Sequence, residues 1–410
     1  MSTAAPGEVQ AAAEERETVF GAARAYLERL KAGDVGSLPV IVGMLVIVLY
    51  FTSQSSNFFT AVNFENVIVQ MAGTTMIAIG VVFVLLIGEI DLSIGYVSGM
   101  AGVTVAYFQM PGSSHQFSGP YAIALAIGVG ALIGLVQGSF VALVGVPSFV
   151  VTLAGLFVWQ GVIIRWIGDR GVIGIQDNLV NDTANYYLSK NAGWIAAAVT
   201  CTGFALVSVV GVISRKRAKL PVGSIAVVAI RVAFITAIGI AAVWIANRDR
   251  GVPFPGLLIV GMLVVWTFVA RRTTFGRHVY AVGGNAEAAR RSGINVRFIR
   301  ICVFMISGAM AAVGGVVLAA RLSSVDLNAG GGTILLEAIA AAVIGGTSLF
   351  GGRGRVVAAL LGALVIATIA NGLSLIGAAA ATQYITTGLI LLAAVVLDTL
   401  SRRRLEASGR

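Results

Sequence analysis

Long uncharged runs of apolar residues dominate the hydropathy pattern of this 410-residue chain. A helix needs about 20 consecutive apolar residues to cross the hydrocarbon core of a bilayer. Runs of about that length follow one another here, separated by short polar or charged segments. We therefore predict twelve membrane-spanning helices, at residues 38–52, 67–87, 94–112, 121–145, 148–167, 194–213, 231–246, 254–270, 299–320, 333–350, 356–377 and 383–399.

The composition agrees with a membrane protein. The chain is 58% hydrophobic and 11% charged, whereas soluble domains contain about 25% charged residues. A transmembrane β-barrel would show alternating segments of about ten residues, and no such pattern is present. The fold class we expect is all-α, a polytopic integral membrane protein. Residues 1–37 lack an apolar stretch, so we interpret them as a cytoplasmic tail and not as a signal peptide.

Basic residues predict the orientation of these spans. With both termini in the cytoplasm, 21 Lys and Arg residues lie on the inner side and 6 on the outer side. Cytoplasmic loops are the ones enriched in Lys and Arg, so this orientation is the expected one. The net charge of +10 therefore reports topology, and no nucleic-acid partner is needed to explain it. Arg231 lies at a predicted boundary: it either reaches the inner surface or, if its span starts near Val222, is an intramembrane charge.

Motifs of enzymes are absent from the sequence. There is no GxxxxGK[ST], HExxH, CxxC or GxSxG, so no nucleotide site, metal site or nucleophile is indicated. Two cysteines, Cys201 and Cys302, lie in apolar runs, and the two histidines are far apart in sequence. We expect a transport protein with no catalytic residue, no metal and no cofactor of its own.

The loop at residues 271–300 contains a short helix with both ends marked. In "NAEAARRSG", Asn285 is a suitable N-cap and Glu287 lies in the first turn. Arg290 follows in the last turn, and Gly293 takes the position after the C-cap. The preceding "GG" pair is expected to break the chain. Because a helix of two turns is unstable alone in water, we expect it to dock, either on a partner or on the protein's own loops.

The segment "GEIDLS" places two carboxylates between two apolar runs. An ionised carboxylate in hydrocarbon is costly, so it needs a partner, water or a special backbone geometry. Asp91 and Ser93 can each cap a helix that begins near Ile94, and for Asp91 contact with a substrate is the alternative. Glu89 is less suited to capping and would pair with an Arg at the inner end or set the polarity of an exit path.

Several of these segments together resemble one protein family. The loop "TTFGRHVYAVGGNAEAARRSGINV", together with "VPSFVVTLAGLFVWQGVI", "AIAAAVIGGTSLFGGRGRV" and "NGLSLIG", is similar to bacterial ABC sugar-importer permeases of the ribose, xylose and galactoside branch. The resemblance covers roughly residues 55–400. Glu89, the "RGVPFP" segment and an extra hydrophobic pair around "RKRAK" are features shared with the xylose permeases. The branch commonly has a second acid two residues before Glu337, where this chain has Leu335.

The resemblance implies a homodimeric transmembrane subunit that binds separate ATPase subunits and receives sugar from an extracytoplasmic binding protein, with ATP used only by the partner. The domains would be a tail (1–37), a permease domain (38–400) that contains the extra pair at about 194–246 and a coupling loop at 271–298, and a second tail (401–410). The residues implied to contact the ATPase are Gly284, Asn285, Glu287, Ala288, Arg290, Gly293 and Ile294.

Two segments of the chain share a spacing of small and apolar residues. Residues 87–95, "IGEIDLSIG", and residues 344–352, "IGGTSLFGG", both read Ile-Gly-x-x-x-Leu-x-x-Gly. In the predicted topology both lie at inner ends of spans, which would make the two halves a parallel repeat with breaks at equal depth. The match is short, and chance is the alternative.

A neutral sugar needs hydroxyl partners and apolar ring faces, so buried amides and aromatic rings are the candidates for its path. The same amides could instead hydrogen-bond between helices. The candidates are Gln70, Gln137, Gln160, Asn371 and Gln383, with Trp159 as a stacking face. Gly130, Gly134 and Gly138 are spaced for helix packing.

Three functions remain open at this point. An ABC-importer permease for a pentose accounts for the docking helix. An ion-coupled secondary transporter would need a titratable residue at mid-membrane, whereas the carboxylates here lie near span ends. A channel-like or scaffold protein is the third class.

Overall fold

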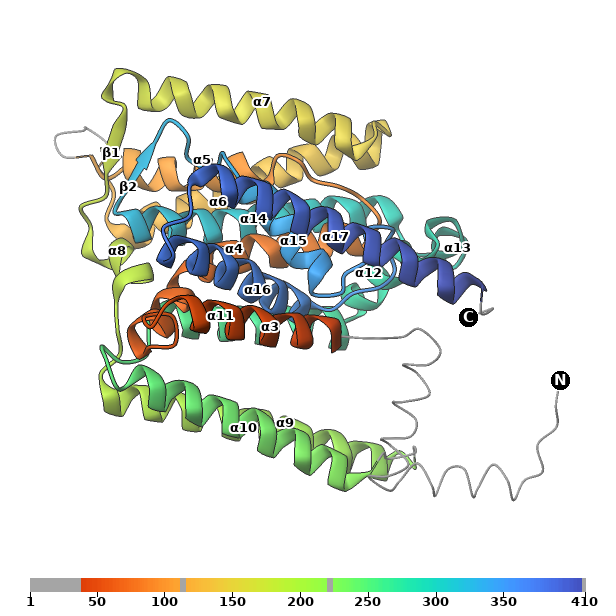
Figure 1. Ribbon diagram of the computed structural model, residues 1–410. Helices are drawn as coiled ribbons and strands as arrows, with labels where there is room; N and C mark the ends of the chain where they lie inside the picture. Colours follow the sequence, from red (N-terminus) through yellow and green to blue (C-terminus); the bar gives the residue numbers. More distant parts are fainter. Residues whose placement is uncertain (1–37, 111–115, 220–223, 408–410) are drawn as a thin grey trace. The chain divides into compact units, whose positions relative to one another are not determined.

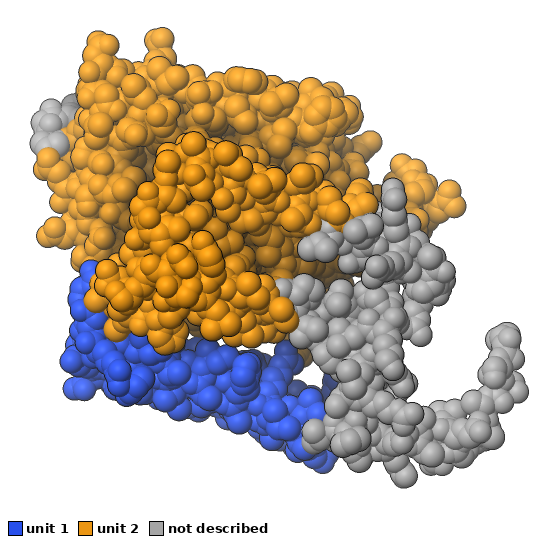
Figure 2. Space-filling view, viewed as in Figure 1, with its two compact units in different colours: residues 1–36, 188–252, 400–410 blue, residues 37–187, 253–399 orange. Residues whose placement is uncertain are grey.

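The computed structural model describes residues 38–110, 116–219 and 224–407 (Figure 1). The predicted tail at 1–37 lies outside these residues. The chain divides into two compact units, one comprising residues 37–187 and 253–399 and the other including residues 188–252 (Figure 2). We describe each unit by itself.

The larger unit is built almost entirely of helices. In chain order before the smaller unit they are α3 (Leu38–Gln54), α4 (Ala61–Leu86), α5 (Ile94–Tyr107), α6 (Gly119–Ser139) with a π-helical turn at Phe140–Val144, α7 (Ser148–Ile167), a 3₁₀ turn at Gly168–Arg170, and α8 (Asn178–Asn185). After it follow α11 (Phe254–Arg272), α12 (Thr274–Gly284), α13 (Ala286–Arg291), α14 (Val296–Leu322), α15 (Ile334–Ile344), α16 (Val356–Leu375) and α17 (Ala380–Ala407).

Each of the twelve predicted spans overlaps a helix, but α5 ends at Tyr107, and residues 111–112 of the span predicted at 94–112 lie outside the described residues. Eight of the helices in the described part of the chain are long and apolar enough to cross a bilayer, and four shorter apolar helices match the other predicted spans. The number of crossings therefore stays a prediction. The span predicted at 333–350 is wrong in extent, because α15 ends at Ile344 and Gly346 adopts φ +100°. The tail predicted from residue 401 is helical up to Ala407, as part of α17.

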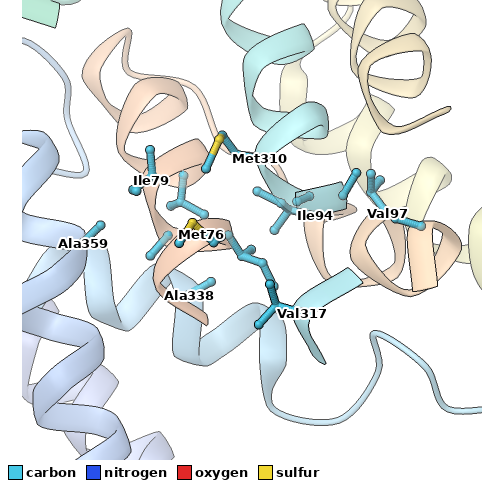
Figure 3. Packing of buried hydrophobic residues seen from close by; sticks show 14 of the residues in the cluster. Met76, Ile79, Ile94, Val97, Met310, Val317, Ala338 and Ala359 are labelled. Carbon is cyan, nitrogen blue, oxygen red and sulfur yellow. The ribbon is translucent and has the colours of Figure 1, made fainter. Parts of the chain in front are cut away.

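The core of the larger unit lies around α4 and α14. Side chains from α4, α5, α14, α15 and α16 point toward one another there, among them Met76, Ile94 and Met310 (Figure 3). Glycines let these helices approach closely, as is typical of membrane bundles. A Cβ at Gly134 of α6 would lie 2.1 Å from the Phe304 carbonyl oxygen, which confirms the packing role predicted for the glycine stripe of α6.

Two short strands qualify the all-α prediction. Strands β1 (Val172–Gly174) and β2 (Ser324–Asp326) pair antiparallel, with Ile173 opposite Val325. The connection from α7 to α8 is thus locally ordered. Its Asp177 accepts a hydrogen bond from Val180 N (3.2 Å) at the start of α8 and another from Gly119 N (2.8 Å) at the start of α6.

The described helices of the smaller unit are α9 (Lys190–Arg217) and α10 (Ile225–Ala246). The two pack as a hairpin through small residues, since a Cβ at Gly239 would lie 3.0 Å from the Cys201 sulfur. The span predicted to start at 231 starts too late. Because α10 begins at Ile225, Arg231 lies inside the helix, and its depth in the membrane stays a prediction.

Candidate functional site

The predicted docking helix is present with both of its predicted ends. Asn285 Oδ1 accepts a hydrogen bond from Ala288 N (2.9 Å) at the start of α13. At the other end, Gly293 N donates to Arg290 O (3.0 Å) and Ile294 N donates to Ala289 O (3.1 Å), with Gly293 at φ +83°. This pair of bonds is the Schellman motif that a glycine at this position favours.

The exposed face of α13 is charged. Glu287 in its first turn forms ion pairs with Arg290 (2.8 Å) and Arg291 (3.3 Å), and all three side chains are more than half exposed. Exposed pairs of this kind add little stability. The exposed face of α13 therefore carries both positive and negative charges, whereas Ala289 on the same helix is buried against the rest of the unit.

Helix α12, which precedes α13, packs against the end of α4 and against the segment between α15 and α16. A Cβ at Gly283 would lie 1.7 Å from the Leu86 carbonyl oxygen and 2.8 Å from Gly352 N, so only glycine fits there. Tyr280 Oη donates to Gly354 O (3.0 Å), and burial raises the pKa of this phenol above its ordinary value. The "GG" pair was expected to break the chain. Instead α12 runs through both glycines to Gly284, and Gly283 serves close packing.

The two segments with shared spacing lie in contact. Gly352 N, in the segment after α15, donates to Leu86 O at the end of α4 (2.9 Å). Gly88 and Gly351 both have positive φ, +74° and +86°, and a Cβ at Gly351 would lie 3.0 Å from Gly88 N. The break after α4 and the break after α15 therefore lie together, and both are next to Gly283 of α12.

The prediction that Glu89 pairs with a nearby arginine is confirmed. Arg300 Nε, in the first turns of α14, lies 3.2 Å from Glu89 Oε1, with side-chain exposures of 32% and 15%. Arg300 Nε makes no hydrogen bond within the described residues, so the contact with Glu89 is an ion pair. It joins the break after α4 to the helix that follows α13 in the chain.

Asp91 is the centre of a buried polar network. Its Oδ1 accepts from Ser93 N (3.0 Å) and Ser93 Oγ (2.7 Å), and its Oδ2 accepts from Ser307 Oγ (3.0 Å) on α14. Asp91 thus satisfies a free backbone N–H at the start of α5, as predicted for it. The capping role predicted for Ser93 is wrong, since its side chain makes no capping bond and turns to Asp91 and Gln137 Oε1 (3.0 Å).

A cavity of about 150 Å³ lies between α15, α16 and α17. Glu337 belongs to it and accepts a hydrogen bond from Thr333 Oγ1. The polar lining consists of Thr333, Glu337, Gln383, Tyr384 and Thr387. The apolar lining consists mainly of Ile366, Ile369, Leu373 and Ile390. The cavity thus offers hydroxyl, amide, carboxylate and aromatic groups together with hydrocarbon.

The structure does not bring the predicted sugar-path residues together. Only Gln383 lines the cavity, whereas Gln137 belongs to the Asp91 network. Trp159 and Gln160 lie on α7, where the buried Trp159 Nε1 atom has no hydrogen-bond partner among the described residues. Asn371 is buried on α16, and its side-chain oxygen likewise has no partner in the described part of the chain.

Sequence reasoning missed three residues of the cavity, Thr333, Tyr384 and Thr387. A signal for two of them was available, because Gln383, Tyr384 and Thr387 form a polar stripe with helical spacing in an otherwise apolar run. Thr333 could be found only from its contact with Glu337. Within residues 38–110, 116–219 and 224–407, no group of three or more His, Cys, Asp or Glu residues could hold a metal ion.

Comparison with known proteins places the chain in a transport family. Residues 63–395 match the family described as the permease component of the branched-chain amino acid transport system, and the chain belongs to this family. Its members are transport subunits and not enzymes, and this chain is a multi-pass membrane protein.

Individual relatives are similar over almost their whole length. The xylose transport system permease protein XylH of Haemophilus influenzae is 35% identical over 92% of this chain and all of the relative. XylH of Escherichia coli K12 is 37% identical over 92% of this chain and 94% of the relative. The ribose import permease protein RbsC of the same strain is 31% identical over 87% and 92%. No solved structure matches the chain.

Proposed function

We propose that this chain is the transmembrane permease subunit of an ABC importer for a monosaccharide, D-xylose or a related pentose. The observation that supports this most directly is the similarity to xylose permeases over 92% of the chain. Identity to the ribose permease is lower, 31% against 35% and 37%. The order of these values favours xylose.

The cavity between α15, α16 and α17 suits a sugar in transit. A pentose is neutral and presents hydroxyl groups on its edge and C–H groups on its faces. The polar lining offers donors and acceptors for the hydroxyl groups, and the Tyr384 ring offers a face for the C–H groups. The open, partly apolar walls favour weak binding, which a transporter needs so that the sugar is released.

Helices α12 and α13 are the proposed contact for the ATPase subunit. The exposed Glu287, Arg290 and Arg291 would meet the partner, while Gly283 and Tyr280 bind the segment to the two breaks. The Glu89–Arg300 pair extends this connection to α14. A displacement of α13 would therefore act directly on both breaks and on α14.

The remaining parts of the assembly follow the family pattern. The chain would form a homodimer, receive sugar from an extracytoplasmic binding protein and leave ATP to its partner. Both termini would be cytoplasmic. The division into a tail at 1–37, a permease domain at 38–400 with an extra pair near 194–246 and a coupling loop at 271–298, and a tail at 401–410 belongs to the same proposal.

Reconstitution tests this function. We expect proteoliposomes containing the chain, its ATPase subunit and its binding protein to take up xylose only with ATP inside, and to prefer xylose over ribose. Uptake driven by a proton or sodium gradient without ATP would instead establish the ion-coupled transporter. Glu287→Lys and Gly293→Pro should uncouple ATP hydrolysis from sugar while leaving membrane insertion intact, and normal sugar-stimulated hydrolysis in both would contradict the coupling role.

Reporter fusions test the orientation separately. We expect a reporter at residue 180 to be extracytoplasmic and reporters at 217 and 287 to be cytoplasmic, because of the distribution of basic residues. A reversed location for any of the three would overturn the proposed topology.

A further inference from the structure

The hairpin of α9 and α10 has a concentration of positive charge that the transport site does not use. Arg215, Lys216 and Arg217 form the last turn of α9, and Lys219 follows two residues later. Arg231 lies on α10, and all five side chains are exposed. The sequence has no Asp or Glu between residues 190 and 247. Among the residues that the structure describes, none forms an ion pair with these five.

The four residues near the end of α9 can be explained by orientation alone, since cytoplasmic loops are enriched in Lys and Arg. Arg231 does not belong to this loop. It lies six residues inside an apolar helix, which corresponds to about 9 Å along the helix axis. An exposed charge at such depth in a bilayer is unfavourable unless it reaches the interface or meets an anion.

The surroundings of Arg231 distinguish between kinds of anion. Val227 and Phe234, one turn before and after it, are 38% and 65% exposed, and Ile230 is 56% exposed. These side chains form an apolar surface beside the guanidinium, which acyl chains would cover. A soluble acidic peptide would supply the negative charge but no hydrocarbon to cover these exposed apolar side chains. A phospholipid has both the required anion and the required hydrocarbon.

We propose that the α9–α10 hairpin binds an anionic phospholipid. Its phosphate lies between Arg231 and the basic end of α9, and its acyl chains lie along the exposed face of α10 that contains Val227 and Phe234. Arg contacts phosphate with a planar fork of donors, whereas Lys acts as a point charge. Arg231→Lys should therefore weaken binding less than removal of the charge.

Native mass spectrometry of the full chain in detergent tests this proposal with phosphatidylglycerol and phosphatidylcholine as probes. We expect the parent protein to retain phosphatidylglycerol at least fivefold more than phosphatidylcholine. Arg231→Leu and Arg231→Gln should each lose most of this preference, and Arg231→Lys should keep part of it. The matched control is Arg248→Gln, because Arg248 lies beyond the other end of α10 and stacks on the Trp244 ring at 3.7 Å.

Three results would overturn the proposal: no preference for phosphatidylglycerol in the parent, an unchanged preference in both Arg231→Leu and Arg231→Gln, or equal competition by glycerol phosphate or a polyglutamate peptide. The melting temperature of each variant, measured in the same detergent, shows whether it is folded. The two neutral variants differ in polarity, so a folding defect in one leaves the other as the test. Because the readout is lipid binding, it is independent of whether xylose is the substrate.

Discussion

Helices α4 and α9 are nearly the same length, 26 and 28 residues, and have the same hydropathy over their most apolar stretches. Yet 89% of that stretch is buried in α4 and none of it in α9. Hydropathy therefore identifies both as membrane helices but says nothing about their place in the protein. The reason is that lipid tails are as apolar as Leu, so apolar character provides no force that brings two membrane helices together.

The difference lies in what each helix offers to its neighbours. In α4, Gly80 faces the backbone of α14, where a Cβ would lie 3.0 Å from Ser307 O, and Thr75 is fully buried. In α9, a Cβ added at Gly203 would meet no other atom within 4 Å. Close backbone approach, and not apolar area, distinguishes α4 from α9.

The largest effect that tests this comparison should come from filling the two glycine positions. Gly80→Leu would force its side chain against Ser307 and Met310, and overpacking of this kind costs about 1–3 kcal/mol or more. Gly203→Leu, the matched change in α9, meets open space and should leave the melting temperature unchanged. Fluorescence-detected gel filtration after heating measures both. Equal losses in the two variants would refute the contrast.

A second, smaller effect should come from the buried acid. Asp91→Ala leaves Ser93 N and Ser307 Oγ without their acceptor, and a buried unsatisfied group costs about 1–3 kcal/mol. Asp91→Asn keeps one acceptor oxygen and should recover most of the stability. Glu89→Gln, in the more exposed pair with Arg300, should alter the transport rate more than the stability.

Ser208→Ala in α9 is the control for this prediction, because its hydroxyl donates only to the Phe204 carbonyl (2.8 Å) of its own helix. Detergent-solubilised yield, melting temperature and sugar uptake would be compared for all four variants. If Asp91→Ala has the same melting temperature as the parent but abolishes sugar uptake, Asp91 belongs to the translocation path and does not serve mainly to stabilise the fold.

The smallest effect on the larger unit should come from removing the hairpin altogether. Leu188 N donates to Val252 O (2.9 Å), so the chain is close together where the hairpin begins and ends. Phe254 N likewise donates to Tyr186 O (2.9 Å). Replacing residues 190–250 with a short glycine linker should shift the melting temperature by no more than about 3 °C, equivalent to roughly 1 kcal/mol. Loss of the folded protein would show that the hairpin is part of the core.

Local features of the site were predictable because neighbouring residues determine them. The ends of α13 follow from Asn285, Glu287 and Gly293, whose preferences act within one or two turns. The pairing of Glu89 with an arginine followed from the cost of an unpaired charge. The cavity was only partly predictable: of its five polar lining residues, Glu337 and Gln383 were noted for separate reasons, and nothing in the sequence placed them together.

By itself, the sequence determined that this is a helical membrane protein, where its apolar helices lie, and how the short helix α13 begins and ends. These features depend on hydropathy and on contacts within a few residues. Only the tertiary structure decided that Ser307 completes the Asp91 network across 216 positions, that Gly283 lies against Leu86, and that α15 ends at Ile344. Such contacts join residues distant in sequence, and in a bilayer they depend on close fit between helices, which apolar character does not specify.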